Sequence, residues 1–410
     1  MRSKPAALLC LCLLICACAQ PGEDTAPASP PPRRVADAIY LGGDILTMEG
    51  GAPQYAEALA VRDGRIVWVG SRSEAQPLQG PATRVVDLNG RALLPGFVDA
   101  NGDLFATAFA ASVANLSPPP DGTASSVTAV TRALYGWSKT EPARRLGWIV
   151  GAGLDEAQLR ERRAPTADEL DEVSRTLPVV ALHRGGRTAA LNNSARELLH
   201  LSRKSSGKGL VSGADFAALR AALPDFDPFE QIDKAQAVYA SLGFTTAQES
   251  GASRGRLAAL AAAADTGKLY LDVDSYADVS SDALDVVSSR YRARGYLNHY
   301  RVAGWTLALD GGADAAFDAK VDQALARGEQ LWVRCGDAAA FDAYGAALRK
   351  ASTTRGSGDR RPVAVVGFAA RGEQIAAFEA LGGIALREAP VSLVEAMRAQ
   401  SRAPTYATLR

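Results

Sequence analysis

The most informative stretch of this chain reads Leu93-Leu94-Pro95-Gly96-Phe97-Val98-Asp99-Ala100-Asn101-Gly102-Asp103-Leu104. Pro95-Gly96 is typical of a turn, and Phe97-Val98 is typical of a strand. The residues after Val98 are polar and rich in loop formers. The stretch therefore predicts a short strand that ends in two polar side chains, Asn101 and Asp103.

Downstream of this stretch, strand-like and helix-like segments alternate, which is typical of a parallel α/β barrel. One helix start is explicit, because Thr166 and Glu169 have the spacing of a capping box. The strand candidates exceed by one the eight that a closed barrel holds, so one is expected to be misassigned or to lie in an inserted hairpin. The candidates are 97–98, 148–151, 179–183, 244–248, 269–273, 305–309, 331–334, 363–366 and 384–386.

The segment before the key stretch carries short strand-like runs between turn signals, including the hairpin signal Asp63-Gly64. From Ala36 onward the chain resembles amidohydrolase family 3, a group of metal-dependent hydrolases. The first barrel strand of that family reads Pro-Gly-Phe-x-Asp-x-His-x-His, and both histidines are metal ligands. In this chain Asn101 and Asp103 stand at the two histidine positions.

The resemblance implies an α/β fold with a (β/α)8 TIM-like barrel over residues 93–410 and a small β-sandwich over residues 36–92. In the family a C-terminal segment returns to complete the sandwich. Because the sequence stops at Arg410 without it, we expect a truncated sandwich. Its open edge is expected to be covered by residues 401–410 or by a second copy of the protein, which would make a homo-oligomer.

Other positions that the family uses for chemistry also differ. Arg187 stands at the position of the family's active-site histidine. Thr306, ahead of Asp310, stands at the position of the lysine that precedes the family's Asp-Gly. The histidine of a later strand is replaced by Arg334 or Cys335, ahead of Asp337. The substitutions that remain are Gly367 for a histidine and Glu388 for an aspartate.

These replacements bear on metal binding. A catalytic Zn²⁺ needs about three converging ligands and an open position for water. The chain has three histidines, His183, His200 and His299, and only His183 lies near a predicted strand end. We therefore expect no cofactor; a single Zn²⁺ held by Asp103, His183 and Glu388 is the alternative.

The predicted pocket still carries charge of both signs. Arg187 and Arg334 could neutralise carboxylates such as Asp103 and Glu388 through paired hydrogen bonds, in place of metal. The alternative is that these charges line a barrel mouth that binds nothing. The candidate pocket residues are Asn101, Asp103, His183, Arg187, Asp310, Arg334, Asp337 and Glu388.

The N-terminus reads as a secretion signal. Arg2 and Lys4 precede an apolar run that is too short to span a membrane. The run ends in Ile15-Cys16-Ala17-Cys18, which resembles a bacterial lipobox. We expect residues 1–18 to be a lipoprotein signal peptide, with Cys18 lipidated, and Pro-rich residues 19–35 to be a disordered tether. An ordinary cleaved signal is the alternative.

These observations predict an envelope lipoprotein in the outer membrane, facing the periplasm, or a secreted periplasmic protein under the alternative. The formal net charge of zero gives no indication of nucleic-acid binding. We expect the protein to bind a small-molecule ligand or an envelope protein at the barrel mouth, without metal-dependent hydrolysis. The alternatives are a hydrolase of non-peptide C–N bonds with an atypical metal site, and a structural envelope protein.

Overall fold

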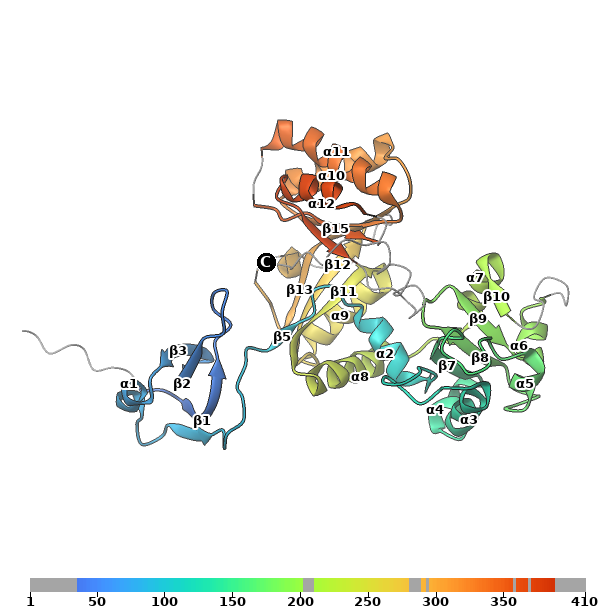
Figure 1. The fold of residues 1–410 in the computed structure, drawn as a ribbon, viewed down its shortest axis with the longest axis horizontal. Helices are drawn as coiled ribbons and strands as arrows, with labels where there is room; N and C mark the ends of the chain where they lie inside the picture. Colours follow the sequence, from blue (N-terminus) through green and yellow to red (C-terminus); the bar gives the residue numbers. More distant parts are fainter. Residues whose placement is uncertain are drawn as a thin grey trace, which may run out of the picture. The chain divides into compact units, whose positions relative to one another are not determined.

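The computed structural model describes residues 35–201, 210–279, 289–292, 295–356, 359–367 and 370–387. The chain divides into two compact units, Met1–Pro95 and Gly96–Arg410 (Figure 1). Across these described ranges, no helix combines the length and the apolar character that crossing a membrane would need.

The first unit contains one four-stranded sheet in the order β3-β2-β1-β4. Asp63 and Gly64, both with positive φ, form the tight turn between β2 and β3, as the sequence predicts. One face of the sheet buries Ile39, Ala58 and Ala60 against a short helix. The structure describes one sheet layer here, so the sandwich stays a prediction. The elements are β1 (Ala38–Leu46), β2 (Tyr55–Arg62), β3 (Arg65–Gly70), α1 (Arg72–Ala75), η1 (Gln76–Leu78) and β4 (Arg84–Asp87).

The second unit is built on a seven-stranded sheet in the order β16-β15-β14-β13-β12-β11-β5. Every neighbouring pair is parallel, as expected when helices connect successive strands. The strands are β5 (Phe97–Val98), β11 (Phe244–Ala252), β12 (Asp272–Asp278), β13 (Tyr300–Leu309), β14 (Gln330–Cys335), β15 (Val363–Val366) and β16 (Ile384–Arg387).

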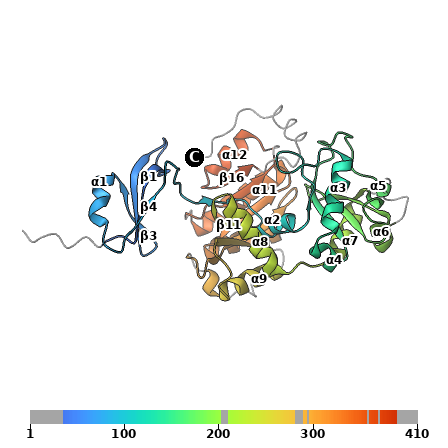
Figure 2. The same cartoon turned by 90° about the horizontal axis from the view of Figure 1, so that it is seen from below.

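The two faces of this sheet differ because successive side chains of a strand point to opposite sides. One face, which includes Val273, Trp305 and Val333, packs against helices in the largest core cluster. The other face carries Tyr276 and Trp332, whose rings lie 4.9 Å apart. Figure 2 shows the helices of this unit from below. Those that belong to the seven-stranded sheet are α2 (Leu104–Ser112), α8 (Pro228–Ser241), α9 (Arg254–Asp265), η4 (Ser289–Arg292), α10 (Ala315–Arg327), α11 (Ala338–Arg355) and α12 (Gly372–Glu379).

A separate five-stranded sheet lies in the chain between α2 and α8, in the order β10-β9-β8-β7-β6 (green in Figure 1). The assignment of segments 148–151 and 179–183 to the barrel was therefore wrong. β8 pairs with β9 in antiparallel fashion, as β9 does with β10, and the sheet has apolar cores of its own. The elements are β6 (Ala114–Asn115), α3 (Val127–Ser138), α4 (Glu141–Leu146), β7 (Ile149–Leu154), α5 (Ala167–Asp171), β8 (Val179–His183), β9 (Thr188–Leu191), α6 (Asn193–Leu198), β10 (Leu210–Ser212) and α7 (Gly213–Ala222).

Candidate functional site

Asp103 lies at the start of α2, immediately after the key stretch. Its Oδ1 accepts a hydrogen bond from the backbone N–H of Ala106 at 2.8 Å, which makes it the N-cap of the helix. The preceding Gly102 has no room for a side chain, because an added Cβ would lie 1.9 Å from the carboxylate of Asp99. Asp103 lies beside β11, where it forms an isolated antiparallel bridge with Glu249.

Glu249 is fully buried on the helix-covered face of β11. Its Oε2 accepts a hydrogen bond from the N–H of Phe105 at 3.0 Å, so it also binds the N-terminus of α2. Its Oε1 lies 2.7 Å from Nη1 of Arg256, in the first turn of α9. The same Nη1 lies 3.3 and 3.4 Å from the two carboxylate oxygens of Asp103. We call Asp103, Glu249 and Arg256 the ion cluster.

Burial governs the protonation of the ion cluster. Burial, aided by the charge of Asp103, outweighs the opposing effect of Arg256 and raises the pKa of Glu249 to about 8. Burial lowers the pKa of Arg256, but the two carboxylates outweigh that effect and the net shift is upward. At neutral pH the guanidinium is therefore charged and Glu249 largely holds a proton, so the cluster is close to neutral.

Asp99 and Asn101 form the turn before Asp103. Oδ2 of Asp99 accepts a hydrogen bond from the hydroxyl of Tyr239 at 2.6 Å, and its Oδ1 accepts one from the N–H of Asn101 at 3.2 Å. The side chain of Asn101 is exposed. This arrangement ties the end of β5 to α8 and leaves one polar side chain at the strand end.

Thr306 and Arg334 lie on the opposite face of the sheet. Thr306, at the family's lysine position, accepts a hydrogen bond from the N–H of Gly251 at 3.3 Å. Register places Thr306 beside Trp332, on the face that also holds Tyr276. Arg334 follows Trp332 on that face and is exposed at the end of β14.

His183 and Arg187 do not join Asp103 on the seven-stranded sheet, because they belong to the inserted sheet. His183 ends β8, where its Nε2 lies 3.2 Å from Glu156 and its Nδ1 accepts a hydrogen bond from the N–H of Gly185 at 3.0 Å. Both ring nitrogens are thus engaged. Arg187 is exposed just before β9.

Of the remaining candidates, some have a local structural role and others lie outside the described residues. Asp337 is the N-cap of α11, accepting a hydrogen bond from the N–H of Ala340 at 2.7 Å. Asp310 is exposed after β13. Cys335 is buried, and burial raises its thiol pKa to about 12. Glu388 and Cys18 lie outside the described residues.

A divalent metal of the kind that the resemblance implies does not fit these residues. Asp103 is committed to the cap of α2 and to Arg256, and His183 has no ring nitrogen left for a metal. Over the ranges that the structure covers, no three His, Cys, Asp or Glu side chains are placed to hold an ion together.

The sequence analysis missed both Glu249 and Arg256. The signal that could have found them is a charged residue inside an otherwise buried strand, since such a residue needs a counter-ion. Arg256 follows it at the start of the next predicted helix. In the structure Asp103 contacts Arg256, whereas the sequence analysis expected Arg187 and Arg334 to neutralise Asp103 and Glu388.

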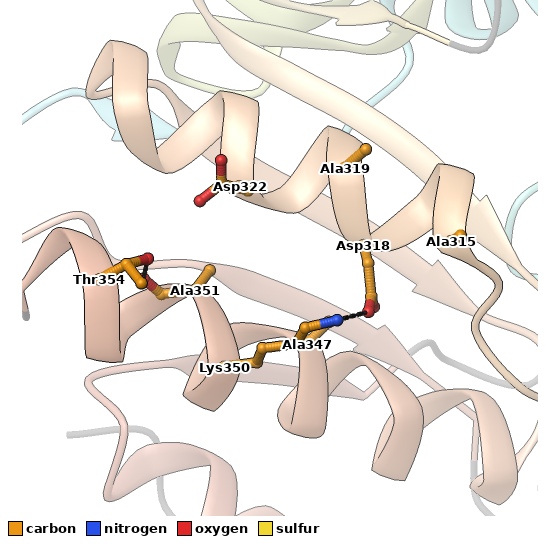
Figure 3. A pocket seen from close by; sticks show the side chains of 8 residues that line it. All are labelled: Ala315, Asp318, Ala319, Asp322, Ala347, Lys350, Ala351 and Thr354. Carbon is orange, nitrogen blue, oxygen red and sulfur yellow. Dashed lines mark hydrogen bonds and ion pairs between the residues drawn. The ribbon is translucent and has the colours of Figure 1, made fainter.

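A groove of about 340 Å³ lies between α10 and α11 (Figure 3). Half of its lining residues are alanines, including Ala319 and Ala347, and the ion pair of Lys350 with Asp318 crosses it at 2.7 Å. Both helices belong to the layer that covers the sheet. The groove is therefore a feature of helix packing, separate from the strand ends.

Comparison with known proteins gives a family match over most of the chain. The profile of the amidohydrolase family matches residues 84–404. Over 163 residues the chain is 29% identical to N-substituted formamide deformylase of Arthrobacter pascens, covering 40% of this chain and 29% of that protein. Over 260 residues it is 27% identical to the exoenzymes regulatory protein AepA of Pectobacterium carotovorum, covering 57% of this chain and 54% of that protein. The chain thus spans about half or less of the length of these relatives.

Two solved structures share the fold. A metal-dependent hydrolase from Pyrococcus horikoshii superposes with a TM-score of 0.62 at 19% identity, covering 85% of this chain and 74% of that one. A metal-dependent hydrolase from Pyrococcus furiosus superposes with a TM-score of 0.63 at 18% identity, covering 85% of this chain and 76% of that one. These matches identify the seven-stranded parallel sheet as the curled, partly closed wall of a TIM-like barrel.

Proposed function

Because the chain belongs to the amidohydrolase family, we propose that it keeps the barrel scaffold of these hydrolases without their metal-dependent hydrolysis. Its role is to bind a small-molecule ligand or an envelope protein at the barrel mouth. The mouth is the end of the sheet where Asn101, Thr306 and Arg334 lie, since binding residues of such barrels sit where the strands end.

One observation carries the proposal. Asp103 stands where the family resemblance puts a metal ligand, yet its carboxylate caps α2 and contacts Arg256. A carboxylate held by a helix N-terminus and a guanidinium has its charge already compensated. Metal coordination would have to displace both partners.

The second candidate is a hydrolase of non-peptide C–N bonds with an atypical single Zn²⁺ site. The similarity to N-substituted formamide deformylase supports it, as does a match of 45% identity over 80 residues to imidazolonepropionase of Symbiobacterium thermophilum. That match covers 16% of this chain and 19% of the enzyme.

Metal content after exhaustive dialysis separates the two candidates. We expect substoichiometric zinc, manganese and nickel in the purified protein and no hydrolysis of an N-substituted formamide. Stoichiometric Zn²⁺ that is lost in Asp103→Asn, together with hydrolysis that the same substitution abolishes, would establish the enzyme instead.

We also propose a location and a mode of attachment. The lipobox-like segment ending at Cys18 would anchor the protein in the bacterial outer membrane, facing the periplasm, with residues 19–35 as the tether. The edge strand β3 exposes Ile66 and Val69, which supports pairing of this sheet in a homo-oligomer.

A further inference from the structure

We draw no further inference here: the strongest candidate, the apolar face of the four-stranded sheet on the side away from α1, where Leu59, Ile66 and Val69 lie, carries none because nothing in the part of the chain that the structure describes shows what covers it.

Discussion

The Nη1 atom of Arg256 lies 2.7 Å from Oε1 of Glu249, a side chain with no exposed surface. The contact joins the first turn of α9 to the middle of β11, and Glu249 in turn binds the N-terminus of α2. One buried carboxylate therefore connects a strand to two helices, and its compensation by Arg256 should matter for the stability of the whole unit.

The first prediction concerns this pair. Above pH 8, where Glu249 is ionised, Arg256→Met should lower the free energy of unfolding by about 3 kcal/mol, because it leaves a buried carboxylate without its partner. Arg256→Met with Glu249→Gln should recover part of the loss, since both charges leave together. Urea unfolding of the wild type, both single variants and the double variant measures the coupling. Additive effects would show that the two side chains do not act as a pair.

The second prediction concerns pH. The pKa of Glu249 is raised from about 4.5 to about 8, so the native state holds this proton more tightly than the unfolded state. Its contribution to stability is then fully present below pH 4.5 and is lost as pH rises toward 8, by at most about 1.4 kcal/mol per pH unit. The difference in unfolding free energy between wild type and Glu249→Gln should fall over that window.

Glu169 provides a control of the opposite sign. Its pairing with Arg163 lowers its pKa to about 2, so its contribution is lost only in acid. The difference between wild type and Glu169→Gln should be constant between pH 5 and 8, in the range where Glu249 titrates. A flat profile for Glu249→Gln as well would contradict a buried, proton-binding Glu249.

The sequence predicted the alternation of strands and helices because that pattern is local. It did not show that segments 148–151 and 179–183 leave the barrel, since a buried strand reads the same in either sheet. The β8–β9 hairpin that removes them depends on Arg184 to Arg187 forming a turn, which was interpreted as a strand end carrying an active-site position.

The candidate site was harder to predict than the fold. Asp103 directly precedes the apolar segment of α2, which is an N-cap signal. The family resemblance led us to interpret this residue as a metal-ligand position instead. The partnership of Asp103 and Glu249 with Arg256 depends on which face of β11 each side chain takes and on how α9 packs. Neither follows from sequence spacing alone.

The third prediction concerns the caps. Asp337→Ala should reduce stability by about 1 kcal/mol, because it removes the acceptor for the N–H of Ala340 at the start of α11. Asp310→Ala, at an exposed position after β13, serves as the matched control and should leave the urea midpoint nearly unchanged. Equal effects of the two substitutions would mean that the loss does not come from the cap.

The last prediction concerns attachment. If Cys18 carries a diacylglycerol and an amide-linked acyl chain, the protein should partition into the membrane fraction, because more than one chain exceeds the threshold for stable anchoring. Cys18→Ser should leave an unprocessed precursor or release the protein, whereas Cys16→Ser should leave Cys18 as the lipidated residue. Fractionation with mass spectrometry of the mature N-terminus distinguishes these forms. Wild-type protein recovered entirely from the periplasm, with an unmodified N-terminus, would show instead that the segment is an ordinary cleaved signal.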